Sequence, residues 1–215
     1  MIVSPARPIS DLRLAAPGVA RLHDNTAWTL THLSGRLVQL EGEGDSAALT
    51  LACSLILEAQ QAGEPAAWVV RRGEPREPSL FYPPDAHENG IDLAALPVVR
   101  VPDLTAVFSA SDLLLRSGGF GLIVADLGVP SAAPSTALAR LAGLARRHQT
   151  AVVFLTRRTA DSHGSLGSLI AVHALARRRR AGTDRFHCGI VALKDKQHGP
   201  AWRHLEVRRG ASGLR

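Results

Sequence analysis

GRLVQLEGEGDSAALTL, residues 35–51, is the stretch that decides the fold class. Residues 36–40 are typical of a buried strand, and Gly42 and Gly44 follow as a turn. The next segment has the apolar spacing of a helix, with Asp45 or Ser46 as the expected N-cap. A strand, a glycine-bearing turn and a helix in this order form the frame of a phosphate-binding loop.

The loop lacks the side chains that phosphate binding needs. In the pattern G-x-x-x-x-G-K-[ST], the second glycine lets the backbone approach the phosphates, the lysine contacts them and the hydroxyl binds magnesium. Counted from Gly42, these three positions are Ala47, Ala48 and Leu49. We therefore expect a degenerate nucleotide loop that holds no nucleotide cofactor.

The turn is also acidic, since it carries Glu41, Glu43 and Asp45. Two like charges about 6 Å apart repel by about 3 kcal/mol at an effective dielectric near 20, and a bound anion would meet the same repulsion. A tightly bound triphosphate is not expected here. One alternative stays open, namely a small anion held by backbone N–H groups at the start of the helix.

The remaining chain alternates strand and helix patterns. Strands are expected at residues 67–70, 98–101, 120–125, 151–156, 186–193 and 202–208, and helices follow Asp103 and Ser135 and cover residues 165–180. Residues 72–97 are expected to hold little regular structure. This pattern predicts an α/β fold with a mostly parallel central sheet, helices on both faces and an antiparallel C-terminal edge.

The length of 215 residues fits one domain. We expect a core at residues 33–208, an N-terminal arm at 1–32 with a short helix near 17–24, and a tail at 209–215. No apolar run approaches 18 residues, and the N-terminus lacks the layout of a signal peptide. The expectation is a cytoplasmic protein without a membrane segment.

The formal charge of +6 comes almost wholly from arginine, because lysine occurs only at Lys194 and Lys196. Arginine is concentrated in the C-terminal third. The residues considered for DNA contact are Arg157, Arg158, Arg177, Arg178, Arg179 and Arg180. For the run 177–180 the alternative is a solvated end of the expected helix, where positive charge complements the helix dipole. Aromatic residues make up only 4%, which argues against base stacking as the main binding mode.

Asp126 ends an apolar strand, at the place where a second nucleotide motif keeps a magnesium-binding carboxylate. The alternative is a structural hydrogen bond at the strand end. Cys53 and Cys188 are expected as buried hydrophobic residues without metal-ligand spacing. The nine histidines show no close cluster, and His198 is expected in a surface loop, so no metal site is predicted.

In their order along the chain, several segments resemble the ATPase core of the bacterial RecA recombinase. The segments are residues 35–51, AAWVV at 66–70, GLIVAD at 121–126, AVVFLTR at 151–157 and VALKDKQHGPAWRHLEV at 191–207. The resemblance covers roughly residues 33–208. Within that superfamily, the degenerate loop and FYPPDAHENGIDLAAL at 81–96 are most similar to the ImuA family, the RecA-like partners of the ImuA–ImuB mutasome.

The resemblance implies the fold without the activity. Besides the loop, Arg71 and Arg72 stand where RecA has its catalytic glutamate, and Arg157 stands where it has the glutamine that senses the γ-phosphate. Asp126 matches RecA's acidic residue. Lys194 and Lys196 match two lysines that reach a neighbouring subunit's nucleotide in RecA. Here they are candidates for partner contact, with simple solvation as the alternative.

What the resemblance implies is a pseudo-ATPase that serves as an adaptor in error-prone translesion synthesis during the SOS response. Its partners would be an ImuB-type pseudo-polymerase and, through it, an error-prone C-family DNA polymerase, with DNA and RecA as further candidates. Residues 1–32 carry no copy of the element through which RecA builds filaments, which leaves that docking surface for a different protein. The alternatives are a RecA-superfamily ATPase with an atypical loop, and a regulator that binds RecA or, like SulA relatives, a cell-division protein.

Overall fold

Strand β1 (Leu37–Gly42) lies inside the sheet between two parallel neighbours, and all six of its residues are buried. The computed structural model describes residues 27–43, 46–72, 81–129, 133–159 and 164–209. Val38 and Leu40 pack on one face of the sheet and Leu37 on the other, as in a strand covered on both sides, while the buried Gln39 and Glu41 have polar partners in the Leu166 amide and His173.

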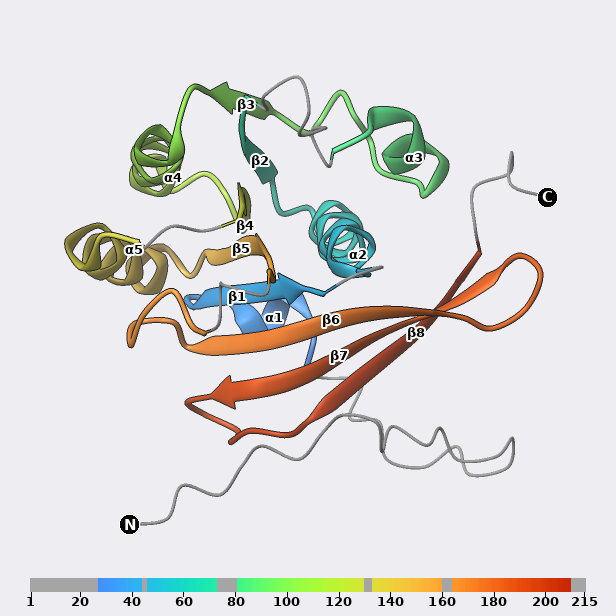
Figure 1. Cartoon of the computed structure of the whole chain (residues 1–215). Coiled ribbons are helices and arrows are strands. Elements are labelled where there is room, and N and C mark those ends of the chain that lie inside the picture. Colours follow the sequence, from blue (N-terminus) through green and yellow to red (C-terminus); the bar gives the residue numbers. More distant parts are fainter. Residues whose placement is uncertain (1–26, 44–45, 73–80, 130–132, 160–163, 210–215) are drawn as a thin grey trace, which may run out of the picture.

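The described strands form one eight-stranded sheet in the order β3-β2-β4-β5-β1-β6-β7-β8 (Figure 1). Six strands are parallel, and β7 and β8 extend the sheet in antiparallel fashion. The other bounds are β2 Ala66–Arg71, β3 Val98–Val101, β4 Leu122–Gly128, β5 Ala151–Arg157, β6 Val172–Arg180, β7 Arg185–Asp195 and β8 Arg203–Arg209. The predicted α/β class, the mostly parallel sheet and the antiparallel C-terminal edge are confirmed.

Helices cover both faces of the parallel part (Figure 1). On one face lie α1 (Leu30–Leu33), α2 (Ala48–Gln61) and α3 (Pro83–Glu88), and on the other lie α4 (Leu104–Ser117) and α5 (Ser135–His148). Each set closes its own hydrophobic cluster against the sheet. None of the helices in the described part of the chain is both long and apolar enough to cross a bilayer.

Local signals in the sequence place most helix ends. Asp103 caps α4, because its Oδ1 accepts a hydrogen bond from the Ala106 amide at 2.8 Å, and Gly118 ends that helix with a positive φ of 67°. At α2 the expected cap was wrong. Its N-cap is Ala47, without a side-chain bond, although Ser46 Oγ accepts from the Ala48 amide at 3.0 Å.

The prediction of a helix over residues 165–180 was also wrong. Residues 172–180 form β6, which pairs with β1 on one side and β7 on the other. Leu166, Leu169 and Ile170 have helical spacing, yet they belong to the connection that precedes the strand. The pairing of β6 along two neighbours decided the outcome, as tertiary context often overrides local propensity.

The packed structure begins before the expected core boundary at residue 33. Ala27, Trp28 and Leu30 are buried, and Trp28 Nε1 donates to the Leu51 carbonyl at 3.4 Å. The stretch expected to hold little regular structure, residues 72–97, contains the short helix α3. The helix expected near residues 17–24 lies outside the described residues, as does all but residue 209 of the expected tail.

A buried ion pair joins the two ends of the described chain. Arg36 donates to Asp195 Oδ1, and the two side chains are 6% and 0% exposed. Asp195 also accepts hydrogen bonds from the Gln197 amide at 2.9 Å and from Trp202 Nε1 at 3.0 Å. Burial alone would raise the pKa of Asp195, but these donors lower it well below the usual range for a carboxyl.

Replacing Asp195 with Asn should lower the free energy of unfolding by about 3 kcal/mol, because it leaves the buried Arg36 charge unpaired. Urea denaturation at pH 7 measures the change, and Lys196→Ala should stay within about 0.5 kcal/mol. The ionised Asp195 stabilises the fold above its unfolded pKa of about 3.9, and this stabilisation is lost as pH falls toward the lower folded value. The difference in the free energy of unfolding between wild type and Asp195→Asn should therefore decrease below about pH 4. A difference that is already small at pH 7 would show that the ion pair of Arg36 with Asp195 does not stabilise the fold.

Candidate nucleic-acid interface

The carboxyl ends of the parallel strands gather most of the residues that the sequence singled out. Gly42 at the end of β1 is in register with Arg157 of β5 and with Ala176 of β6. The Arg158 amide donates to the Gly42 carbonyl at 2.8 Å. In open α/β sheets, ligands bind at this edge.

The degenerate loop is built into the hydrophobic core. Ala47 and Ala48 are 0% and 8% exposed, and Leu49 packs against the same cluster. A Cβ on Gly42 would lie 2.3 Å from Ser46 Oγ, so only glycine fits beside the folded-back serine. Because Ser46 already accepts from the Ala48 amide, a donor that a phosphate would use is bonded within the loop. Gly44 lies outside the described residues.

The acidic residues of the turn need a correction. Glu41 is buried and lies 3.2 Å from His173 Nε2, and Glu43 forms an ion pair with Arg177, whose Nε donates at 3.0 Å. These two carboxylates are therefore partnered by cationic or titratable groups, which weakens their expected repulsion of an anion. Asp45 lies outside the described residues.

The other residues at this edge have structural contacts as well. Asp126 is buried at the end of β4, where its Oδ1 accepts from the Gly128 amide at 3.1 Å. This is the hydrogen bond at a strand end that the sequence left open as an alternative. Arg157 and Arg158 are half-buried, and Arg157 Nε has no hydrogen-bond acceptor in the described part of the chain.

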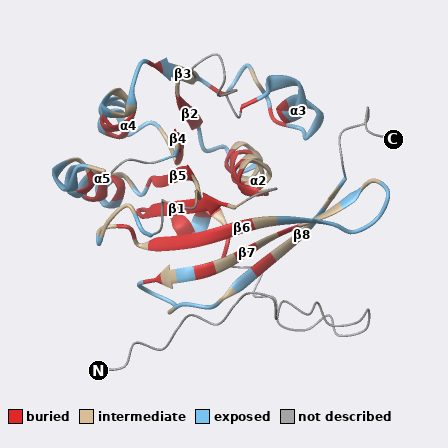
Figure 2. Ribbon diagram, viewed as in Figure 1, coloured by how far each residue is buried: buried red, intermediate tan, exposed pale blue. Residues whose placement is uncertain are grey.

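The antiparallel strands bury only one face of the sheet. Along β7, Cys188, Ile190 and Ala192 are buried and alternate with more accessible residues, as expected for a strand with one solvated side. In β6 the first five residues are buried and the last three are exposed. Figure 2 shows this as a change from red to pale blue toward the β6–β7 hairpin.

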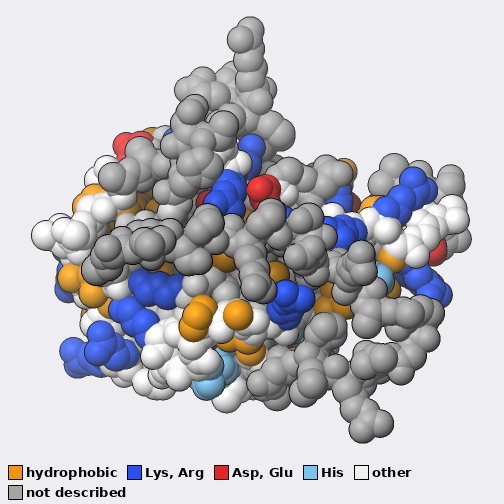
Figure 3. Space-filling view, turned by 60° about the horizontal axis from the view of Figure 1, so that its bottom comes forward, with side chains coloured by type: hydrophobic (Ala, Val, Ile, Leu, Met, Phe, Trp, Pro, Cys, Tyr) orange, Lys and Arg blue, Asp and Glu red, His pale blue; other side chains and the backbone are white. Residues whose placement is uncertain are grey.

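We call the accessible side of these strands the open face. Strand register puts the following side chains on it: Arg177, Arg179, His187, Val191, Lys194, Arg203, Leu205, Val207 and Arg209. The charged residues in this set are all Arg or Lys, and none is Asp or Glu. Figure 3, which turns the β6–β8 side forward, shows Lys and Arg side chains spread around hydrophobic and histidine side chains. A basic sheet face with apolar residues between the charges suits a phosphate backbone.

Strand geometry splits the arginine run into two pairs, so the expected helix end was wrong. Arg177 and Arg179 point to the open face, because side chains alternate along β6. On the opposite face the Arg178 guanidinium lies 5.1 Å from the centre of the Phe186 ring, and Arg180 donates to the carbonyls of the hairpin turn at 2.9 and 3.1 Å. Arginines at positions i and i+2 of a strand share a face, so a strand pattern over residues 177–180 could have predicted this division.

A groove of about 580 Å³ lies on the opposite face of the β6–β8 strands, between them and helices α2 and α3. Its lining includes Phe186 and Tyr82, and Tyr82 is 60% exposed. Cys53 and Cys188 also face it. Burial raises the pKa of Cys53 to about 12 and that of Cys188 above its ordinary value, so both thiols stay protonated at neutral pH.

The two lysines differ in their surroundings. Lys194 is half-buried, and its Nζ lies 3.4 Å from the Ser168 carbonyl, whereas Lys196 is exposed. Burial, followed by the charge of Lys196, lowers the pKa of Lys194. Of the two, Lys196 is the more accessible for contact with another molecule.

No protein-family model matches this chain, and no curated protein matches its sequence. The geometry itself defines the class: an α/β protein with a mixed sheet. Its β1–α2 loop lacks the side chains that bind phosphate, and its C-terminal strands present a basic open face.

Replacing Arg179 and Arg203 together with alanine should weaken binding to a fluorescein-labelled single-stranded oligonucleotide. The slope of log K against log salt should decrease in magnitude by about 1.4, since each arginine neutralises about one phosphate and a single strand contributes about 0.7 to the slope per contact. The control is Arg178→Ala with Arg180→Ala, which removes the same charge from the opposite face and should change the affinity less. Equal losses in both double variants, measured by fluorescence anisotropy, would show that net charge and not the open face determines binding.

Proposed function

We propose that this chain is a non-catalytic, RecA-like adaptor of the ImuA kind, which joins an ImuB-type pseudo-polymerase to DNA in error-prone translesion synthesis. Through that partner it acts with an error-prone C-family DNA polymerase. Its contribution is contact and not hydrolysis.

The observation that carries the proposal is the burial of Ala47 and Ala48 in the hydrophobic core. In a working loop, the lysine and the hydroxyl from this part of the chain must reach phosphate and metal. Here Ala48 and Leu49 occupy the corresponding positions in the first turn of α2, and both pack against the hydrophobic core. The loop consequently supports the fold and supplies no charge to a nucleotide.

The fold supports the same proposal at a coarser level. A parallel sheet that continues into antiparallel C-terminal strands is the arrangement that the RecA resemblance implies. Asp126 keeps the place of the acidic residue at the end of β4, but its Oδ1 serves a backbone amide. Retention of the frame without its charged groups is consistent with a binding role.

Two separate surfaces support an adaptor. The open face offers cations for a phosphate backbone, and the groove offers Tyr82 as an accessible aromatic anchor beside Arg178 and Arg208. Accessible aromatic residues next to arginine are typical of protein interfaces. DNA and a protein partner could thus be bound on opposite sides of the same strands.

Calorimetry with ATP or ADP and magnesium should give no binding heat, and no phosphate should be released, because the loop supplies neither the lysine nor the hydroxyl. Micromolar binding with turnover that Asp126→Ala abolishes would favour the alternative of an atypical ATPase. Binding without turnover would return nucleotide to the mechanism as a switch.

A purified ImuB-type pseudo-polymerase should bind the folded chain and lose affinity for a Tyr82→Ala variant by about tenfold or more, as expected for a truncated aromatic anchor. Leu113→Ala, which truncates an exposed apolar side chain of α4, is the matched surface control. Surface plasmon resonance measures both, with RecA as a second analyte. Absence of binding to the pseudo-polymerase, or equal binding to the urea-unfolded chain, would overturn the adaptor role, and binding to RecA alone would favour the regulator.

A further inference from the structure

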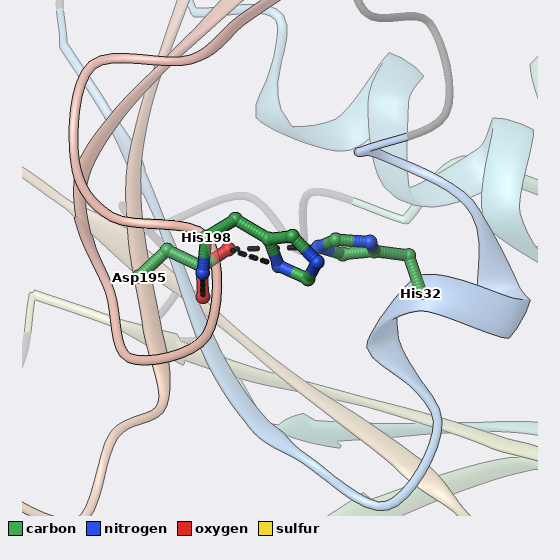
Figure 4. A group of neighbouring side chains, drawn as sticks. All are labelled: His32, Asp195 and His198. Carbon is green, nitrogen blue, oxygen red and sulfur yellow. Dashed lines mark hydrogen bonds and ion pairs between the residues drawn. The ribbon is translucent and has the colours of Figure 1, made fainter.

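Three side chains that are far apart in the sequence meet beside the antiparallel strands. His32 comes from α1, Asp195 ends β7, and His198 lies in the turn between β7 and β8 (Figure 4). One potential ligand atom from each lies within 4.8 Å of the others. The histidine spacing in the sequence predicted no metal cluster, because only the tertiary structure brings α1 to this turn.

The distances fit a metal site better than hydrogen bonds. His32 Nε2 and His198 Nδ1 each lie 3.5 Å from Asp195 Oδ2, beyond the usual range of N–H···O bonds. Two ligand atoms of a tetrahedral zinc ion are about 3.3 Å apart, given zinc–ligand distances of about 2.0–2.1 Å. His32 Nε2 is buried and has no hydrogen-bond partner among the residues that the structure describes.

The surroundings of Asp195 prepare its carboxylate for this role. Trp202 Nε1 donates to Oδ2, while Arg36 and the amides of Gln197 and His198 donate to Oδ1. Such outer contacts orient the ligands of metal sites. An ionised carboxylate has about four lone-pair sites, so Oδ2 can accept the indole and still face the two imidazoles.

The two imidazoles give the site a closed side and an open side. His32 is 13% exposed, whereas His198 is 52% exposed, and their ring centres lie 4.2 Å apart. A site with three protein ligands and one side open to solvent leaves a fourth position for water. Two imidazole nitrogens and one carboxylate suit zinc, whereas calcium and magnesium require mainly oxygen ligands.

We propose that His32, Asp195 and His198 form a zinc site that fastens α1 to the β7–β8 turn. A bound ion would cross-link the N-terminal helix to the strands that carry the open face. The site is independent of the proposed adaptor role, since it needs neither the groove nor the arginines.

The test is calorimetric titration of zinc into metal-free full-length protein, with cobalt as a spectroscopic probe. One equivalent should bind with a micromolar or tighter Kd and raise the Tm. His198→Ala, a change in an exposed turn, should lose at least about tenfold in affinity, the loss that even an outer-shell change can produce. His187→Ala, on the open face, should bind as the wild type does.

His198→Cys provides a rescue, because its thiolate should restore binding and add a thiolate-to-cobalt absorption band that the wild type lacks. The proposal is overturned if one equivalent does not bind, as would follow if the Arg36 charge excludes the cation. Equal affinity in His198→Ala would overturn it too, as would a thiolate band in the wild type, which would place the metal at Cys53 or Cys188.

Discussion

The ion pair of Arg36 with Asp195 is the contact on which the C-terminal half of the structure depends. Arg36 directly precedes the inner strand β1, and Asp195 ends the antiparallel strand β7. Neither charge is accessible enough to be stabilised by water, so each requires the other. The same carboxylate accepts from Trp202 and lies near two histidines, which joins α1, β1 and the β7–β8 turn into one unit.

One-sided burial of the C-terminal strands leaves an accessible face on the sheet. The helices cover the parallel strands on both faces, whereas β6, β7 and β8 extend past them and keep an accessible side (Figure 1). Alternation along β6 then gives Arg177 and Arg179 to one face and Arg178 and Arg180 to the other. A single run of like residues thereby serves a basic face and a groove.

The loop after β1 is packed as part of the hydrophobic core. Ala47 and Ala48 are buried at the start of α2, Ser46 Oγ accepts from the Ala48 amide, and Glu43 forms an ion pair with Arg177. Each of these residues has its own local contact. Ala48 and Leu49 stand at the positions where a phosphate-binding loop has its lysine and its hydroxyl. The fold keeps its sheet because strand pairing needs none of the missing side chains.

By itself, the sequence determined the class of fold, most strands and helices, and the lack of a lysine and a hydroxyl at the phosphate-binding positions of the β1–α2 loop. The periodicity of apolar residues, the helix caps and the motif positions are local properties of the chain. Asp103 and Gly118 bound α4 as their chemistry requires. Only the tertiary structure made residues 172–180 a strand, since that depends on pairing with β1 and β7. It likewise brought His32 to Asp195 and His198, and it partnered Glu41 and Glu43. These contacts cross long sequence separations, so no local pattern encodes them, and the free energy of packing and ion pairing decides them.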